Sequence, residues 1–513
     1  MGQVGIRLDP HRKQPLHRQI FDEVVMRIES RAFPPGFKLP PTRVLARELD
    51  THRNTVARAY GDLQAAGFVS STVGRGTFVE QRAPSLDPHL PLAASETGSA
   101  RELPWEALLS HAARSDALGR SKRHVRATGQ RDVVNLARMQ PSPDLIPDEL
   151  LSRCIAYALS EHGPQALSYA PIEGTPGLRE QIVRDLAERG VPARSDEVLV
   201  TGGSQQGLDL VARALLNPGD ALLVEPTTYS GAIDLFTLAG ARVVAVPVDA
   251  EGPDPDALGR LSRQDVKALY LMPNAHNPSG RTLPAERRRA LVKWSRDAGI
   301  PIIEDDYAAG LSLEDRRAPP HLRALDGEVI HISTLSKRLA PGLRLGYVVV
   351  PARLRPVLGS LKHLVDLGSS LLLQHAVAEF MERGYLRAHS RRINVEYRKR
   401  RDVLHEALRK NLPRSVSWQL PTQGVVMWLQ LPRSLDALAV YEEALRRGVL
   451  VSPSPVWSVA PHAEPAVRLA FCGEPAERVA EGARRLSQAI KHLLSRTRGE
   501  APAADADPIL EVV

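Results

Sequence analysis

Cysteine and long apolar stretches are scarce in this chain. Only two of its 513 residues are cysteines, Cys154 and Cys472, which excludes a disulfide framework. Its most apolar segments, such as residues 347–354 and 424–431, are far shorter than the roughly 18 residues that a membrane-spanning helix needs. The first residues carry charges where a signal peptide needs an apolar segment. Together these absences predict a soluble protein of the reducing cytoplasm, with no membrane partner.

The composition is that of a globular protein. Hydrophobic residues make up 43% and charged residues 25% of the chain, which excludes disorder or a coiled coil over the whole length. A length of 513 residues predicts at least two domains. The net charge of +8 is uneven, because residues 1–82 hold 13 Lys and Arg against 8 Asp and Glu, a surplus of +5. A basic first segment favours a nucleic-acid partner, because binding releases the counterions of the polyanion.

The basic segment has the pattern of a small helical domain. Apolar residues recur every four positions over 16–28 and predict a first helix. A second helix is expected over 42–49, with Val44 facing inward. Asp50 or Thr51 is expected to cap a third helix.

A hairpin over 68–79 follows the third helix, with a glycine-rich turn at 74–76. Three helices and a hairpin predict a winged helix-turn-helix, whose third helix enters the major groove of DNA. Side chains of that helix reach base edges, while the hairpin turn touches phosphates or the minor groove. We expect DNA contacts from Arg53, Asn54 and Arg58 on the helix and from Arg75 on the turn.

The stretch from Phe33 to Val79 resembles the GntR-type DNA-binding domain over nearly its whole length. The alternative is a small helical domain with solvated arginines, which leaves the ordered combination of exposed helix and wing unexplained. The resemblance implies that double-stranded DNA is contacted by Arg43, Arg53, Thr55 and Gly76.

The rest of the chain divides at two segments without a periodic pattern. Residues 83–130 contain several prolines and are expected to form a linker. Residues 496–513 are expected to form a disordered tail. Between them, residues 131–495 alternate short apolar runs with helix-length segments. This alternation predicts an α/β domain with a mostly parallel sheet covered by helices on both faces.

Ligand-binding side chains in such sheets follow the carboxyl ends of the strands. The Gly-rich turn TGGSQQG offers free N–H groups and a helix N-terminus to a phosphate. The carboxylates of EDDY suit a metal, a cation partner or a general base, and metal is the weaker choice because no His or Cys cluster has ligand spacing. A desolvated Lys337 near the cation Arg344 loses its proton easily and can form a Schiff base. The five polar strand ends are TGGSQQG (201–207), EPTTYSG (225–231), PNAHNPSG (273–280), EDDY (304–307) and STLSK (333–337).

The order of these motifs is similar to the aspartate aminotransferase superfamily, the fold type I enzymes that use pyridoxal 5'-phosphate (PLP). The resemblance implies that Lys337 forms the internal aldimine and that Asp305 pairs with the pyridinium nitrogen. It also implies that Tyr229 stacks on the ring and that Asn277 and Tyr307 bond the ring hydroxyl. The residues implied to hold the phosphate are Ser204, Gln205, Thr334, Ser336 and Arg344.

The resemblance extends to the end of the domain and to the way the domains are joined. The string VRLAFC matches the segment whose arginine receives a substrate carboxylate, so Arg468 takes that role, and a smaller C-terminal α+β subdomain is implied. A GntR-type domain joined to such a fold resembles the MocR subgroup of GntR-family transcription regulators. That subgroup implies a homodimer that senses a small amine or amino acid by aldimine exchange at Lys337.

Two departures from the subgroup keep other functions open. AHNPSG (275–280) is closer to working aminotransferases, and Ala308, Ala309 and Gly310 replace acidic residues that such regulators often carry. The main alternative is therefore an active PLP-dependent aminotransferase with an attached DNA-binding domain. A scaffold without cofactor is a third.

Overall fold

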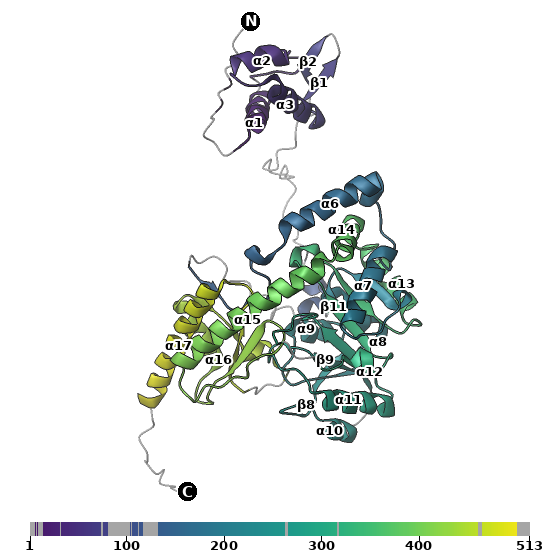
Figure 1. The fold of residues 1–513 in the computed structure, drawn as a ribbon, viewed down its shortest axis with the longest axis vertical. Helices are drawn as coiled ribbons and strands as arrows, with labels where there is room; N and C mark the ends of the chain where they lie inside the picture. The colour runs from purple at the N-terminus through teal and green to yellow at the C-terminus, as the bar shows by residue number, and fades with distance from the viewer. Residues whose placement is uncertain are drawn as a thin grey trace. The chain divides into compact units, whose positions relative to one another are not determined.

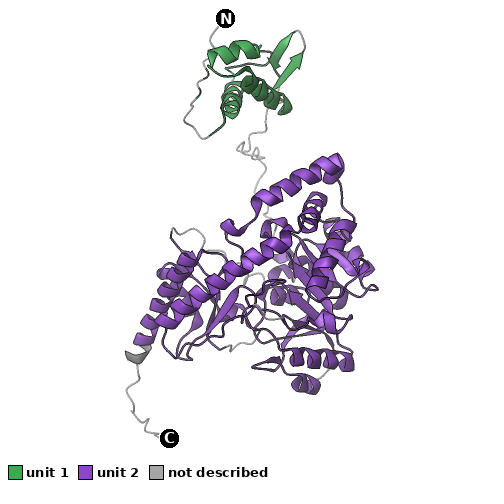
Figure 2. Cartoon of the chain, in the orientation of Figure 1, with its two compact units in different colours: residues 1–104 green, residues 105–513 purple. Residues whose placement is uncertain are grey.

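The protein is described from a computed structural model, which divides into two compact units, residues 1–104 and 105–513 (Figure 2). Each unit is described by itself. Most of the segment expected to form a linker lies outside the described residues, as do residues 500–513. The described residues are 6, 8, 14–30, 32–72, 75–80, 103, 105–110, 112–115, 132–261, 265–314, 318–459 and 464–499.

The described residues of the first unit form three helices and a hairpin (Figure 1). Ile20 and Val24 of the first helix and Val56 and Leu63 of the third are fully buried in one apolar core. The two strands pair antiparallel, so the predicted winged helix-turn-helix is confirmed. Its elements are α1 (Leu16–Glu29), α2 (Thr42–Glu48), α3 (Arg53–Ala65), β1 (Val69–Thr72) and β2 (Gly76–Val79).

Two details predicted for these helices are wrong. Val44 is exposed, because the seven-residue helix α2 makes only about two turns and turns Leu45 and Ala46 inward. Asp50 does not cap α3, because it has a left-handed φ of 46° just after α2. His52, and not Asp50 or Thr51, occupies the N-cap position of α3, and its side chain makes no capping hydrogen bond.

The second unit is built on a seven-stranded sheet with the order β4-β12-β11-β10-β9-β5-β6. Strand β12 runs antiparallel to both of its neighbours, and every other pair is parallel. The predicted mostly parallel sheet is therefore confirmed, with one strand from each of seven apolar runs. The strands are β4 (Val198–Thr201), β5 (Ala221–Val224), β6 (Arg242–Ala245), β9 (Val266–Leu271), β10 (Ile302–Asp306), β11 (Ile330–Thr334) and β12 (Gly346–Val349).

Apolar side chains bury both faces of this sheet. On β4, Leu199 belongs to one buried cluster and its neighbours Val198 and Val200 belong to another, as alternation along a strand requires. Polar side chains therefore reach a ligand mainly where the strands end. The helices of this part are α6 (Asp148–His162), α7 (Pro176–Glu188), α8 (Ser204–Leu215), α9 (Ser230–Leu238), α10 (Pro255–Arg260), α11 (Ala285–Ala298), α12 (Leu322–Leu325), α13 (Arg355–Asp366) and α14 (Leu371–Glu382).

A smaller α+β subdomain ends the unit, as the resemblance implied. Its antiparallel strands have the order β13-β16-β15, and the long helices α15 and α17 pack side by side (Figure 1). Helix α17 continues to Gly499, past the boundary expected at residue 495. The elements are α15 (Tyr385–Asn411), β13 (Val426–Gln430), α16 (Ala437–Arg446), β15 (Ser452–Pro453), β16 (Ala466–Ala470) and α17 (Ala476–Gly499).

Short elements connect these parts. Strand β3 (Val134–Asn135) pairs in parallel with β14 (Val449–Leu450), which brings the start of the domain to the subdomain. A hairpin is formed by β7 (Val248–Asp249) and β8 (Gly252–Pro253), and α4 (Trp105–Leu108) precedes the domain. In the described ranges, no helix combines the length and apolarity needed to cross a membrane.

Candidate functional site

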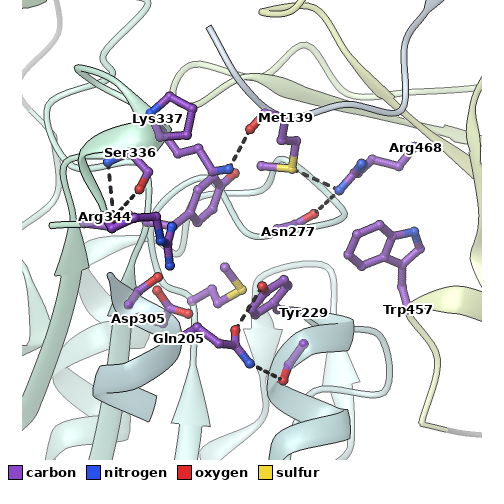
Figure 3. Close-up of a pocket in the computed structure, with 16 residues that line it drawn as sticks. Met139, Gln205, Tyr229, Asn277, Asp305, Ser336, Lys337, Arg344, Trp457 and Arg468 are labelled. Atoms are coloured by element: carbon purple, nitrogen blue, oxygen red, sulfur yellow. Dashed lines mark hydrogen bonds between the residues drawn. The ribbon is translucent and has the colours of Figure 1, made fainter. Parts of the chain in front are cut away.

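A cavity of about 410 Å³ lies where the strands of the main sheet end (Figure 3). The sheet strands bring together polar residues that are far apart in the sequence. All eleven residues predicted to bind the cofactor or effector line this cavity: Ser204, Gln205, Tyr229, Asn277, Asp305, Tyr307, Thr334, Ser336, Lys337, Arg344 and Arg468.

Lys337 enters the cavity from the segment after β11. Its Nζ donates a 2.6 Å hydrogen bond to the carbonyl oxygen of Met139. Burial lowers the pKa of Lys337, and the cations Arg468 and Arg344 lower it further, against an opposing effect of Cys472. A lowered pKa increases the share of neutral amine, which is the nucleophilic form.

Asp305 enters the cavity from the end of β10. Its Oδ2 accepts a 2.8 Å hydrogen bond from the Tyr270 hydroxyl, and its Oδ1 is buried with no hydrogen-bond partner among the described residues. Burial raises the pKa of Asp305 to about 7, and the charge of Asp306 contributes to the shift. A buried carboxylate oxygen without a partner is suited to a cationic N–H donor, such as a protonated pyridine nitrogen.

Behind Asp305, the opposite face of β10 carries a buried polar cluster. Asp306 Oδ2 pairs with the Arg189 guanidinium at 2.9 Å. Glu304 pairs with His331 at 3.0 Å, and His321 lies 3.4 Å from the same carboxylate. No His or Cys cluster has ligand spacing in the sequence, but the fold brings ligand-type atoms of Glu304, His321 and His331 within 4.8 Å of one another. Their sequence spacing hides this, since they come from three separate elements.

The turn between β4 and α8 contacts Arg344 in the cavity wall. Arg344 Nη2 donates a 2.8 Å hydrogen bond to the Gly202 carbonyl, and a Cβ on Gly203 would lie 2.9 Å from that nitrogen. Gly203 also has a left-handed φ of 107°, so the turn requires glycine. Thr334 and Ser336 add hydroxyls at 3.0 Å from each other. A helix N-terminus, a guanidinium and hydroxyl groups together suit a phosphate.

Three more of the predicted residues line the walls of the cavity. The Tyr229 hydroxyl donates a 3.1 Å hydrogen bond to Gln205 Oε1. The Tyr307 hydroxyl donates a 2.6 Å hydrogen bond to the Ala275 carbonyl, so only its oxygen lone pairs are free for a ligand. Asn277 Oδ1 accepts from Arg468 at 3.0 Å, which leaves the amide N–H₂ of Asn277 to donate.

Arg468 reaches the cavity from β16 of the subdomain. Its Nη1 donates to Asn277 Oδ1, its Nη2 donates to the Ala137 carbonyl, and its Nε is buried without a hydrogen-bond partner among the described residues. Burial lowers the pKa of Arg468 to about 10. Its hydrogen-bond partners within the described ranges include no carboxylate. A buried guanidinium without a counter-ion is suited to an anionic ligand group.

Five residues of the cavity wall were not predicted from the sequence. Met139 contacts both Lys337 Nζ and Arg468 Nη1, and Trp457 lies against Arg468. Neither residue follows an apolar run that marks a strand of the main sheet, so the sequence offered no signal for them. The five are Met139, Gly231, Met272, Pro341 and Trp457.

The first unit presents the residues predicted to touch DNA on its surface. Thr55 and Gly76 are partly exposed. A Cβ on Gly76 would lie 2.7 Å from Lys38 Cε, and Gly76 has a left-handed φ of 116°. The other part of the predicted turn, Gly74, lies outside the described residues. The exposed members are Arg43, Arg53, Asn54, Arg58 and Arg75.

Two known families match two separate parts of the chain. Residues 131–486 match the family model described as aminotransferase class I and II, and residues 16–79 match the bacterial regulatory proteins of the gntR family. The HTH-type transcriptional regulator TauR of Rhodobacter capsulatus is 32% identical over 94% of this chain and 98% of its own length. The probable rhizopine catabolism regulatory protein MocR of Rhizobium meliloti is 29% identical over 87% of this chain and 88% of its own length.

The chain belongs to the MocR subgroup of gntR-family regulators. Like its relatives, this MocR-type regulator joins a DNA-binding domain to an aminotransferase-like domain. The second domain resembles the crystal structure of LysN, an α-aminoadipate aminotransferase of Thermus thermophilus complexed with N-(5'-phosphopyridoxyl)-L-leucine. That structure has a TM-score of 0.71 and 31% identity, and the match covers 77% of this chain and 100% of LysN.

The cofactor of this MocR-type regulator is PLP. The cavity fits it on two observations: the partnerless Asp305 Oδ1 and the glycine turn that leaves room for an anion beside Arg344. When bound, PLP supplies an aldehyde that reacts with primary amines and a ring that accepts electrons. The protein is thus a PLP-dependent, DNA-binding transcription regulator, which excludes the cofactor-free scaffold.

Proposed function

We propose that this regulator senses a small amine or amino acid, whose amino group takes the place of the Lys337 amine on the cofactor aldehyde. The observation that carries the proposal is the shared cavity of Lys337 and Arg468. An amine with a lowered pKa and a buried guanidinium without a carboxylate meet there. An amino acid carries a group for each of them. Its amine competes with Lys337 for the cofactor aldehyde, and its carboxylate pairs with Arg468.

The roles proposed for the cavity residues are those that the resemblance to fold type I enzymes implies. Lys337 holds the cofactor covalently, and Asp305 Oδ1 pairs with the ring nitrogen. Tyr229 stacks on the ring, while Asn277 and Tyr307 bond the ring hydroxyl. The phosphate is held by Ser204, Gln205, Thr334, Ser336 and Arg344.

The DNA-binding domain is proposed to act through its third helix and its wing. The helix supplies Arg53, Asn54, Thr55 and Arg58, and the wing supplies Arg75 and Gly76, with Arg43 beside them. A DNA-bound protein works in the cytoplasm of a bacterium. We place the DNA-binding domain at 1–82, a linker at 83–130 and the start of the PLP domain at 131. Because α17 runs to Gly499, the PLP domain ends at residue 499 and not at 495.

A homodimer is proposed from an exposed apolar surface of the PLP domain. Leu364 on α13 is 83% exposed and Tyr169 is 81% exposed. A Cβ on Gly368 would lie 3.1 Å from the Ala170 carbonyl, so the two segments are neighbours. Exposed apolar side chains on neighbouring segments are typical of protein interfaces. Leu364→Asp is expected to shift sedimentation towards a monomer. The control is Leu420→Asp, which changes an exposed leucine of the subdomain and is expected to leave sedimentation unchanged.

An active aminotransferase remains the second candidate function. Its support is AHNPSG (275–280) and the 31% identity to LysN, an α-aminoadipate aminotransferase. Multiple-turnover assays with amino donors and keto acids separate the candidates, because a sensor binds its amine without sustained turnover. Turnover at rates on the order of 1 per second or faster supports the enzyme.

Borohydride trapping tests the covalent step directly. Reduction of the holoprotein followed by peptide mass analysis is expected to find the pyridoxyl group on Lys337 and nowhere else. Lys337→Ala is expected to lose both the adduct and any response of DNA binding to amino acids. The matched control is Lys399→Ala, which removes an exposed lysine of α15. An adduct at another residue would contradict the proposal.

A further inference from the structure

Trp457 lies against the arginine that is proposed to receive the effector. Its ring centroid is 4.2 Å from the Arg468 guanidinium carbon, and Figure 3 shows the two side chains together at one end of the cavity. At this distance the cation is attracted to the face of the indole ring. The contact is buried, since Trp457 is 5% and Arg468 is 4% exposed, so water does little to screen it.

The indole ring is fixed relative to Arg468 by the sheet of the subdomain. The indole N–H donates a 3.0 Å hydrogen bond to the Ser452 hydroxyl. Ser452 on β15 lies directly opposite Arg468 on β16. The ring is therefore anchored to the strand next to the one that carries the guanidinium.

The hydrogen bonds of Arg468 do not compensate its charge. Its hydrogen bonds go to an amide oxygen, a carbonyl oxygen and the Met139 sulfur, none of which carries a charge. A buried guanidinium costs several kcal/mol of desolvation unless its charge is compensated. The Trp457 ring is the large π surface in contact with it, and it compensates part of this cost without occupying the hydrogen-bonding edge that a carboxylate uses.

The backbone around Trp457 is also hydrogen-bonded to the segment that carries Tyr229. The Thr228 N–H donates a 2.9 Å hydrogen bond to the Trp457 carbonyl, and Val459 N–H donates to the Pro226 carbonyl at 2.9 Å. Tyr229, which is proposed to stack on the cofactor ring, directly follows Thr228. The backbone around Trp457 thus links the subdomain that carries Arg468 to the segment that carries the stacking tyrosine.

We propose that Trp457 is a positioning residue that holds the Arg468 guanidinium for the carboxylate of the effector and thereby makes the site prefer amines that carry a carboxylate. This inference rests on the function proposed above. Trp457 acts through Arg468 and does not itself touch the reacting amine. Its removal therefore weakens carboxylate recognition without a matching change in amine recognition.

The test measures a ratio of affinities on the full-length holoprotein. Amino acids are titrated against the cofactor absorption band, each beside the amine that lacks its carboxyl group: alanine with ethylamine, and 4-aminobutanoate with propylamine. Trp457→Leu is expected to weaken binding of the responding amino acid by about 3- to 30-fold, the range of a buried cation–π contact. The paired amine is expected to change less than twofold. Trp457→Phe, which keeps a π face, is expected to recover most of the affinity.

A double-mutant cycle with Arg468→Gln shows whether Trp457 acts through the arginine. In that background, Trp457→Leu is expected to leave the ratio unchanged. Equal weakening of amino acid and amine in the Trp457→Leu protein would overturn the inference, since a general packing defect has that effect. No change in either affinity would overturn it as well. If no amino acid or amine shifts the band of the unmodified protein, the proposed sensing function falls too, which separates that failure from a failure at Trp457 alone.

Discussion

The Tyr270 hydroxyl on β9 donates a 2.8 Å hydrogen bond to Asp305 Oδ2 on the neighbouring strand β10. Both side chains are buried, and this bond lowers the pKa of Asp305 against the larger opposite effect of burial. Tyr270 thus favours the carboxylate form that a protonated cofactor ring needs.

Replacing Tyr270 with Phe is expected to raise the pKa of Asp305 above about 7. Less carboxylate is then available at neutral pH, so PLP affinity of the apoprotein falls by about tenfold or more, the value of a hydrogen bond to a charged group. The pH midpoint of PLP binding moves upward. Absorbance titrations between pH 6 and 9 measure both. Tyr397→Phe is the control, because that buried hydroxyl has no hydrogen-bond partner among the described residues. An equal loss in the control would contradict the assignment.

Asp305 also predicts how the stability of the apoprotein depends on pH. Its pKa of about 7 in the folded state exceeds the ordinary value of 3.8. The folded state therefore holds one more proton than the unfolded state between these values, and the free energy of unfolding falls as pH rises through this range. Asp305→Asn removes the titration. The apoprotein variant is expected to gain stability above pH 7, on the order of 1.4 kcal/mol for each unit of the shift, and to gain none near pH 4. Urea unfolding at several pH values checks this, and parallel pH profiles for both proteins would refute it.

The convergence of the cofactor residues was predictable because strands of the main sheet are marked in the sequence. Each apolar run became a strand, and strands that run in parallel end at one edge. The residues just after these strands, from Ser204 to Lys337, are therefore expected to lie close together at that edge. Arg468 needed the resemblance to a family, because its strand belongs to a different, antiparallel sheet.

Other parts of the site left no sequence signal. Met139 and Trp457 reach the cavity through pairings of short strands at distant positions, such as β3 with β14 and β15 with β16. Strands of two residues have no detectable periodicity. The cluster behind Asp305 was missed for a related reason, because Arg189 comes from the end of α7 and meets Asp306 only in the folded sheet.

The Arg189 and Asp306 pair makes a prediction of its own. Arg189→Met leaves a carboxylate that is 1% exposed without its guanidinium partner, and breaking a buried pair in this way costs about 3–5 kcal/mol. Arg189→Met is therefore expected to lower the free energy of unfolding by roughly that amount. Asp306→Asn in the same protein removes the buried charge that has lost its guanidinium partner and is expected to restore at least half of the loss. Arg189 also contacts Asp185 and Tyr347, so full recovery is not expected. Additive effects of the two changes in urea unfolding would show that the pair is not coupled.

The exposed start of α3 makes the DNA-binding role testable apart from the cofactor. Arg53→Ala is expected to weaken binding to a duplex that the unmodified protein selects from a random pool by about tenfold, within the 1–3 kcal/mol of a specific base contact. The cofactor absorption band is expected to stay unchanged, because Arg53 lies in the other compact unit. Arg414→Ala is the charge-matched control, since it removes an exposed arginine of the PLP domain.

Binding to unselected DNA separates two modes of contact by Arg53. A loss confined to the selected duplex indicates that Arg53 reads a base, and an equal loss on both kinds of DNA indicates a phosphate contact. The same loss in the Arg414→Ala protein would mean that net charge, and not the position on α3, sets the affinity.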